Sequence, residues 1–529
     1  MPQISPRPRL RAAVAAAAII PLIALAGCAA GGSAKTANPA PTNGVLTVGL
    51  LGDIGQPPDP DIYYANNGTA LIINTYEGLV QYKNNVSEVQ IAPRLATSWT
   101  VSDDKTVYTF KLRSGVTFHD GTPFTSAAVK VAFDRRIAVN GGAAYMVQGV
   151  KSVDAPDDLT AIVTLSAPNS AFLDELASPF GPKMESPTGL TKNAGSDNAQ
   201  TYLMTHDLGT GPYELTSAQT GTKYELTQYP KYWGTISPFT KIELPVYTDP
   251  SALELAFDKG AVSMIAAALP SSALKKYSDT SYSKSYFLPT LQSALITVNP
   301  SKSFFSTLDA RIAFMSAIDK KTLVKQVLGE RSEVATTMYA KGMISGGADK
   351  QTIAYNPSKM KAYAKTAGDK KLVIGYATGN TNAEQIANIL AAQLIADGLD
   401  ATAQTYTTST VFGWAADPTQ GPDAFIDGNN GPDGGSPYLW GHVFWDKSGG
   451  IDYFLCDNPK TNELLNQALA TGDEATYIKA AAEYESTGCY LQLSYNKDWV
   501  VAQNWLTNVP QAQNLGANEV DFSLLGIMK

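Results

Sequence analysis

The chain has 529 residues, of which 44% are hydrophobic and 17% are charged, a balance typical of a globular protein and not of a disordered one. That length suits two or three domains rather than one. The formal net charge of −8 provides no electrostatic basis for binding nucleic acid, so that class of function is excluded first.

The N-terminus has the pattern of an export signal. Three arginines precede an apolar run over residues 12–26, which is too short for a stable transmembrane span. The run ends in Leu-Ala-Gly-Cys28, which looks like a bacterial lipobox. We expect residues 1–27 to be a lipoprotein signal peptide, Cys28 to carry the lipid, and residues 28–43 to be a flexible tether. The alternative is an ordinary signal peptide with a chance cysteine.

The mature fold is expected to start with a buried strand over residues 45–51. A loop rich in Pro and Asp follows, over residues 52–64. The polar stretch 66–69 then leads into a helix-like segment over residues 70–80.

The next stretch, residues 93–124, alternates between apolar and polar side chains. Tyr108, Phe110 and Leu112 are expected to face one side of a half-buried strand, which follows an earlier strand near residues 99–101. A helix should start after Thr125, whose hydroxyl suits an N-cap. Two further strands are expected at residues 147–153 and 160–165.

Helical spacing predicts helices over residues 251–259 and 309–318 in the second half of the chain. A strand over 371–376, a helix over 383–397 and a strand over 401–407 then form a β-α-β unit, which indicates a parallel sheet. The residues expected to face inward from this helix are Ile386, Ile389, Leu390, Leu394 and Ile395.

Several of these stretches resemble the family 5 extracellular solute-binding proteins of ABC importers. Residues 93–124 follow the family pattern "P-x-L-A-x-S-W … D-G-x-x-Y-T-F-x-L-R-x-G-V-x-F-H-D-G-x-P-F" and depart from it mainly at Lys105, where the family usually has Gly. Further family markers are similar to residues 209–234, 309–320 and 355–368.

The resemblance implies an α/β fold of the periplasmic-binding-protein type, with two lobes in a Venus flytrap arrangement and an extra small domain. The expected boundaries are lobe I at 44–80, 206–298 and 501–529, the small domain II at 81–205, and lobe III at 299–500.

The ligand should be decided largely by residues 423–445, a strand followed by a glycine-rich loop and an aromatic cluster. In peptide-binding relatives this strand end carries "G-W-x-x-D", whose aspartate pairs with the α-amino group of the peptide. The Trp is absent here, and Asp433 is the nearest acid. The ligand-binding candidates are Asn67, Thr69, Asn429, Asn430, Asp433, Tyr438 and Trp440. For the two Asn, a tight turn is the alternative, and for Trp440, a place in the core.

Cys456 and Cys489 remain once Cys28 is lipidated. An even pair in an exported chain predicts one disulfide, with two buried thiols as the alternative.

We therefore expect a monomeric lipoprotein on the outer face of the bacterial cytoplasmic membrane that passes a solute to an ABC permease and ATPase. Short peptides are the first choice of solute and oligosaccharides the second. A surface sensor on the same fold stays open. No Gly-x-Ser-x-Gly or His-Glu-x-x-His motif occurs, so an enzyme is disfavoured. The pattern indicates neither a cofactor nor a metal site.

Overall fold

The protein is described by a computed structural model that covers residues 38–528, except 66, 267–268, 279 and 517–519. Contacts divide the chain into residues 1–36 and residues 37–529, and the description below concerns the second unit. The predicted signal peptide, Cys28 and most of the tether lie outside the described residues.

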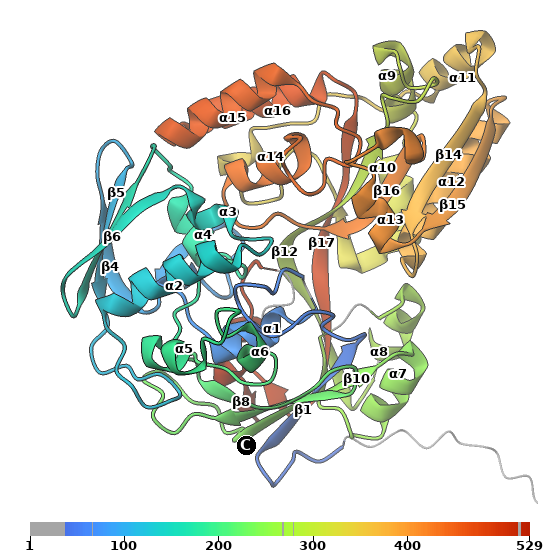
Figure 1. Ribbon diagram of the computed structural model, residues 1–529. Coiled ribbons are helices and arrows are strands. Elements are labelled where there is room, and N and C mark those ends of the chain that lie inside the picture. Colours follow the sequence, from blue (N-terminus) through green and yellow to red (C-terminus); the bar gives the residue numbers. More distant parts are fainter. Residues whose placement is uncertain (1–37, 66, 267–268, 279, 517–519, 529) are drawn as a thin grey trace, which may run out of the picture. The chain divides into compact units, whose positions relative to one another are not determined.

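An eleven-stranded sheet runs through this unit (Figure 1). Its strands are, in spatial order, β15 (Asp400–Tyr406), β14 (Lys371–Ala377), β16 (Ala424–Asn430), β12 (Ser283–Val298), β17 (Tyr490–Gln503), β11 (Met264–Ile265), β1 (Val45–Leu51), β10 (Lys241–Tyr247), β9 (Lys223–Gln228) and β8 (Tyr213–Gln219), with β13 (Ser332–Val334) also paired to β17. The long antiparallel strands β12 and β17 connect its two halves.

Each half of the sheet has its own hydrophobic core. In the "β1 region", strands β1 and β8–β10 bury residues such as Leu46, Val48 and Leu226. In the "β14 region", strands β14–β16 pack Ile374 and Ile426 against a layer of helices. Strand β14 is parallel to both β15 and β16, so the predicted β-α-β unit with a parallel sheet is confirmed.

The helices of the two regions are as follows. The β1 region carries α1 (Thr69–Thr75), α7 (Pro250–Asp258) and α8 (Leu274–Ser278). Those after β12 are α9 (Leu308–Ser316), α10 (Lys320–Leu323), α11 (Pro357–Thr366), α12 (Thr381–Ala396), α13 (Thr408–Gly413), α14 (Pro437–Trp445), α15 (Pro459–Thr471) and α16 (Glu474–Glu485). Two small ribbons pair β2 (Val80–Tyr82) with β3 (Ile91–Pro93) and β18 (Leu506–Thr507) with β19 (Gly526–Ile527).

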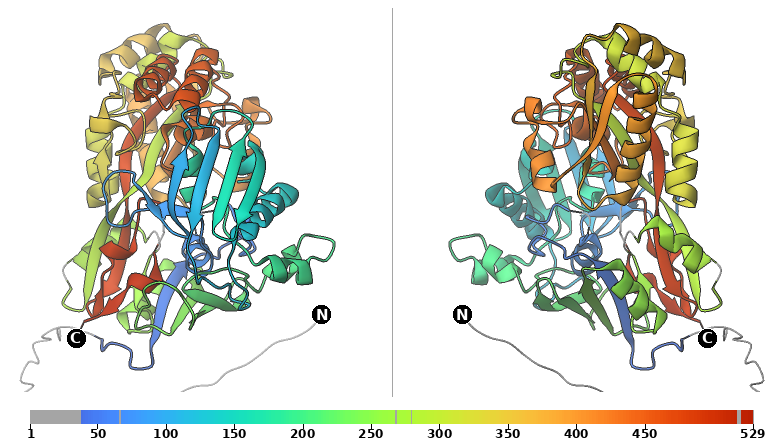
Figure 2. Two further views of the ribbon diagram at one scale, coloured as in Figure 1. Left: turned by 90° about the vertical axis from the view of Figure 1, so that its left-hand side faces the viewer. Right: turned by 90° about the vertical axis from the view of Figure 1, so that its right-hand side faces the viewer.

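A separate four-stranded sheet follows β3 and is seen face-on in the left view of Figure 2. Its strand order is β4 (Ala96–Val101), β5 (Val107–Leu112), β7 (Thr160–Leu165) and β6 (Val150–Asp157). The helices between β5 and β8 are α2 (Ser126–Val139), α3 (Tyr145–Gln148), α4 (Phe172–Ala177), α5 (Pro187–Asn193) and α6 (Gln200–Leu203). Tyr108, Phe110 and Leu112 are buried on one face of β5, so the predicted half-buried strand is confirmed.

Three expectations about these elements are wrong. Helix α1 ends at Thr75, because Tyr76 has extended backbone, and Val80 starts a strand. The strand expected from residue 147 begins at Val150, since residues 145–148 form the short helix α3. Ile395 on α12 is 55% exposed, because it lies beyond the face that contacts the sheet.

Two local features noted in the sequence have a clear physical basis. Cys456 and Cys489 form a disulfide with a Cα–Cα distance of 6.4 Å, which confirms the predicted bond. Lys105, where the family usually has Gly, has a backbone φ of 57°. This left-handed conformation suits glycine and is unfavourable for other residues, which explains the family's preference.

Candidate functional site

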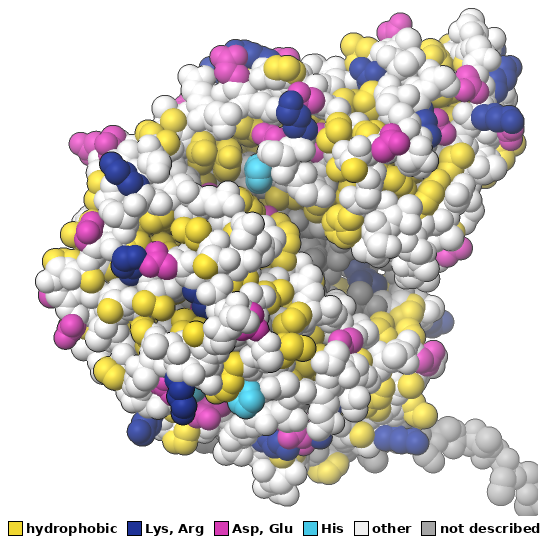
Figure 3. Space-filling model, in the orientation of Figure 1, with side chains coloured by type: hydrophobic (Ala, Val, Ile, Leu, Met, Phe, Trp, Pro, Cys, Tyr) yellow, Lys and Arg dark blue, Asp and Glu magenta, His cyan; other side chains and the backbone are white. Residues whose placement is uncertain are grey.

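A cavity of about 530 Å³ lies between the β1 region and the β14 region. Figure 3 shows the molecular surface hollowed between these regions, on the right of the view. Val48 and Leu50 of β1 form one wall, and the loop between β14 and α12, with Thr378 and Asn380, lies on the other. The residues contributed by the long strands are Gln292, Asn496, Lys497, Asp498 and Trp499. Segments far apart in the sequence therefore meet at the strands that join the two regions.

Side-chain amides form a hydrogen-bonded network on the cavity wall. Asn429 donates to Oε1 of Gln292 at 2.8 Å, and Asn496 donates to Oδ1 of Asn429 at 2.7 Å. Ser332 donates to Oδ1 of Asn496 at 2.8 Å. Amides both donate and accept hydrogen bonds, so this wall can exchange its internal bonds for bonds to the amide or hydroxyl groups of a solute.

Three charged side chains line the same cavity. Lys497 pairs with Glu333 at 2.9 Å, and Asp498 accepts a hydrogen bond from Gln513 at 2.7 Å. Arg331 is half-buried and donates to the backbone carbonyl of Leu269 at 2.8 Å, with its guanidinium carbon 5.7 Å from the ring centre of Trp499. Burial lowers the pKa of Arg331, an effect that nearby Asp498 partly offsets.

Two of the predicted ligand-binding residues line this cavity. Asn67 and Asn429 are both exposed and belong to its wall. Thr69 begins α1 and is buried. Asn430, at the end of β16, instead donates to Oδ2 of Asp427 at 3.0 Å. Their roles in ligand binding stay a prediction.

The other predicted residues lie away from the cavity wall. Asp433 is buried, and its Oδ2 accepts hydrogen bonds from the hydroxyls of Tyr64 at 2.5 Å and Tyr145 at 2.6 Å. Burial raises the pKa of Asp433, although these two hydrogen bonds oppose the shift. Tyr438 on α14 is half-buried and stacks on His442. Trp440 is fully buried in the core around α14.

A second polar cluster has three buried carboxylates close enough together to hold a metal ion: Asp59, Asp61 and Glu185. The guanidinium of Arg135 already contacts all three, at 2.6–3.1 Å, and Arg136 bonds Oδ1 of Asp61 at 2.8 Å. Two arginine cations therefore occupy the position that a metal ion would take. This cluster fixes the loop before α1 to helix α2.

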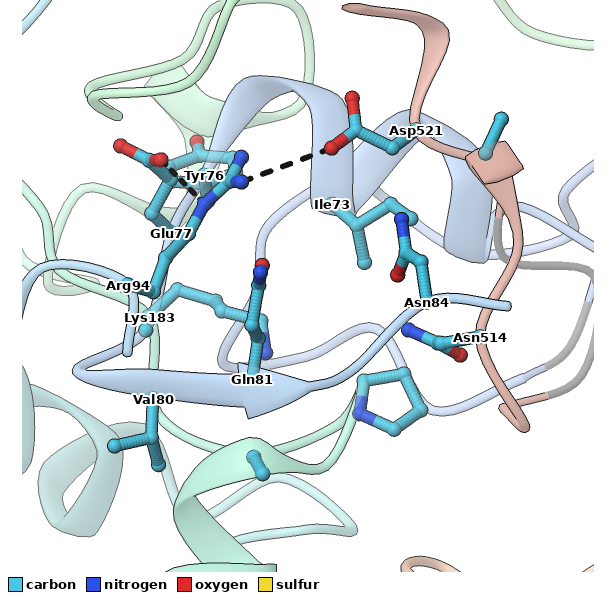
Figure 4. Close-up of a pocket in the computed structure, with 14 residues that line it drawn as sticks. Ile73, Tyr76, Glu77, Val80, Gln81, Asn84, Arg94, Lys183, Asn514 and Asp521 are labelled. Carbon is cyan, nitrogen blue, oxygen red and sulfur yellow. Dashed lines mark ion pairs between the residues drawn. The ribbon is translucent and has the colours of Figure 1, made fainter. Parts of the chain in front are cut away.

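A third polar site is the small pocket in Figure 4, where Arg94 lies between Glu77 and Asp521. Its Nε is 2.6 Å from Glu77, and its Nη1 is 3.6 Å from Asp521. The pocket volume of about 40 Å³ leaves room for little more than water. These charges connect β3 to the C-terminal segment and are compensated without a ligand.

Sequence patterns gave no indication of Arg331, Lys497 or Asp498. Arg331 stands in no family marker and reaches the cavity only because β13, directly after it, pairs with β17. The Lys-Asp-Trp run at 497–499 reads as part of an ordinary strand, and its place in the cavity depends on the pairing of β17 with β12. Only tertiary contacts reveal this part of the site.

Comparisons with known proteins give a consistent family. The model of the family described as "Bacterial extracellular solute-binding proteins, family 5 Middle" matches residues 90–451, more than half of the chain. The probable D,D-dipeptide-binding periplasmic protein DdpA of Escherichia coli is 28% identical over 474 residues, covering 87% of this chain and 90% of the relative. The nickel-binding periplasmic protein of the same organism is 24% identical and covers 89% of this chain and 93% of the relative.

Solved structures share the fold at low sequence identity. The periplasmic binding protein DppA from Helicobacter pylori, in complex with the peptide STSA, superposes with a TM-score of 0.78 at 21% identity and covers 92% of this chain and 98% of that one. NikA from Brucella suis, in complex with Fe(III)-EDTA, gives 0.80 at 21% identity, with 91% and 99% coverage. The predicted α/β periplasmic-binding-protein fold is confirmed.

Within the described residues, no helix combines the length and the apolar character needed to cross a membrane. The family consists of extracytoplasmic binding proteins that serve ABC importers and are not enzymes. The chain belongs to the bacterial extracellular solute-binding proteins of family 5.

Proposed function

We propose that this protein captures short peptides in the cavity between the β1 and β14 regions and delivers them to an ABC permease. The observation that carries the proposal is the amide-lined wall formed by Gln292, Asn429 and Asn496 in a cavity of about 530 Å³. Ligand cavities commonly measure about 300–1,000 Å³. Relatives described as dipeptide- or peptide-binding support a peptide as the solute.

Asp433 is the proposed anchor for the α-amino group of the peptide. In the described part of the chain, the hydroxyls of Tyr64 and Tyr145 donate to this buried carboxylate, and no lysine or arginine forms an ion pair with it. An ammonium group would compensate its charge and favour the ionised form of the carboxylate. Gln292 lines both the cavity and a small space beside Pro432 and Gly434, and therefore lies between the cavity and the Asp433 loop.

Mass spectrometry of the solute released from purified protein tests the peptide assignment. We expect a set of short peptides. Recovery of sugars or of other non-peptide solutes would contradict it and favour the alternative of a different solute on the same fold.

The Asp433 anchor has a separate test by calorimetry. A peptide with a free amino group should lose about 10- to 100-fold in affinity on Asp433→Asn, because a charge-assisted contact is lost. The N-acetylated peptide, which carries no ammonium, is the matched control and should bind both proteins equally. An unchanged affinity of the free peptide for Asp433→Asn, or for Asp433→Ala, would rule out the anchor.

We further propose that a lipid on Cys28 holds the protein at the outer face of the cytoplasmic membrane as a monomer. The proposed boundaries are lobe I at 44–80, 206–298 and 501–529, domain II at 81–205 and lobe III at 299–500. Cys28→Ser should release the protein from the membrane fraction into the medium, while Cys456→Ser should leave it membrane-bound. A membrane-bound Cys28→Ser variant would contradict the lipid anchor.

A further inference from the structure

The inter-region cavity has the opposite charge balance to the chain as a whole. The chain has a formal net charge of −8, whereas the ionisable residues that line the cavity are Arg331, Lys497 and Asp498. The Lys497 ammonium is already compensated by Glu333 at 2.9 Å. Among the described residues, the cation of this cavity that forms no ion pair is Arg331.

The guanidinium of Arg331 lacks an acidic partner. Across the described residues, no carboxylate lies within 4.0 Å of it, and its one protein hydrogen bond is the 2.8 Å bond from Nη1 to the carbonyl of Leu269. A guanidinium has five N–H donors, so most of its donors have no protein partner here. Arg135 and Arg136 differ, since each forms ion pairs with one or more acids.

The surroundings of Arg331 favour an incoming anion. The side chain of Arg331 is half-buried, and the ring centre of Trp499 lies 5.7 Å from the guanidinium carbon. Asp498, in the same cavity, acts on the charge of Arg331 but forms no ion pair with it. A half-buried cation without an ion-pair partner gains more from a carboxylate than a fully solvated one does. The planar fork of the guanidinium also matches the two oxygens of a carboxylate.

We propose that Arg331 binds a carboxylate of the solute in the inter-region cavity. In a short peptide this group is the C-terminal α-carboxylate, and the inference then rests on the peptide function proposed above. Asp433 at one end and Arg331 at the other would together select a solute that carries both an ammonium and a carboxylate group.

Arg331 could instead be a purely structural contact, because its hydrogen bond joins the segment after β11 to the residue before β13. The two roles differ in what they do to matched ligands. A structural contact affects the binding of all solutes equally, whereas a carboxylate contact affects only those with a carboxylate.

The test compares peptides with a free C-terminal carboxylate and the same peptides as C-terminal amides, by calorimetry. Wild-type protein should prefer the acid about 10- to 100-fold, as expected for one charge-assisted contact. Arg331→Gln should lose this preference through weaker acid binding. Lys341→Gln, which removes an exposed cation that pairs with Glu333 outside the cavity wall, should keep it. An undiminished acid preference in Arg331→Gln, or no preference in wild type, overturns the inference.

The chemistry of the released solute separates this inference from the peptide assignment. A non-peptide solute with a carboxylate would support the role of Arg331 while contradicting the peptide proposal. A peptide set with blocked C-termini, or any neutral or purely cationic solute, would overturn the role of Arg331. If no solute is released, thermal stabilisation by a panel of small carboxylic acids and their primary amides gives the decision. Equal stabilisation by both members, or by neither, counts against Arg331.

Discussion

Arginine occurs in two opposite settings in this protein. Around α2, Arg135 and Arg136 are buried, contact Asp59, Asp61 and Glu185 directly, and leave no space for a ligand. In the cavity beside β17, Arg331 has no acid within ion-pair distance among the described residues, and a volume of about 530 Å³ lies in front of it. An arginine whose charge is compensated by acids stabilises the fold, whereas one without an ion pair can serve the ligand contact proposed above.

Removing one compensated arginine should have a large effect on stability. Arg136→Met leaves Asp61 with one of its two arginine partners and removes bonds to the carbonyls of Pro60 and Phe180. We therefore expect a loss of about 3 kcal/mol in the free energy of unfolding. Urea denaturation followed by circular dichroism measures it. The exposed Lys130, paired with Asp134 on the same helix, gives the control Lys130→Met, which should change little. Equal losses of unfolding free energy in the two variants would contradict the distinction between buried and solvent-exposed ion pairs.

The disulfide should contribute a similar amount by a different route. Cys456 and Cys489 are separated by 33 residues, and closing a loop of that length in the unfolded chain corresponds to about 3–4 kcal/mol. The double variant Cys456→Ser/Cys489→Ser should unfold at lower urea concentration and still bind solute with unchanged affinity, because neither cysteine lines the cavity. A loss of affinity in the folded double variant would show that the bond also shapes the cavity.

Glu175 is a buried acid that, among the described residues, has no arginine partner, so its contribution to stability should depend on pH. Burial raises the pKa of Glu175 to about 8, helped by the nearby Asp174, while a hydrogen bond from Asn169 opposes the shift. The folded state therefore keeps this proton when the unfolded state, with a pKa near 4.5, has released it. Stability from this group is present below about pH 4.5 and is lost as the pH rises toward 8.

Unfolding free energies of wild type and Glu175→Gln between pH 5 and 8 check this. The wild-type value should fall relative to that of the variant as the pH rises. The difference between the two proteins isolates Glu175 from Asp174, whose pKa burial raises to about 7. A constant difference over this range would mean that Glu175 is ionised in the folded protein throughout.

The smallest expected effect concerns the backbone and involves no charge pairing. Lys105 has a φ of 57°, a conformation that costs non-glycine residues about 1–2 kcal/mol. Lys105→Gly should stabilise the protein by less than that, since glycine also gains freedom in the unfolded chain. Lys105→Ala keeps the left-handed strain and removes the charge, so it should not stabilise. Stabilisation by Ala would assign the effect to the charge.

Local patterns predicted much of the fold but only part of the cavity. The alternation in β5, the β14-α12-β15 unit and the Cys456–Cys489 bond could be recognised because each depends on neighbours in sequence or on a residue count. Asn67, before α1, and Asn429, near the end of β16, were singled out and line the cavity. Arg331 could not be, because its position depends on pairings between β13, β17 and β12.

Periodicity also failed where a helix or turn ends. It assigned Ile395 to the inner face of α12 without information on where the sheet stops, and it continued α1 past Thr75, where the backbone becomes extended. Such ends depend on what the next segment packs against, which a window of sequence does not contain.

The pairing of β12 with β17 is interrupted between Pro289 and Ser293 and again between Ala294 and Leu295. Irregular pairing makes a sheet easier to bend at that point, and Gln292 and Asn496 line the cavity there. A solute bound in the cavity would therefore restrict bending of the sheet at the irregular pairing of β12 with β17. A fluorophore attached beside this interruption would report solute binding as a change in its fluorescence anisotropy, whatever the chemical nature of the solute.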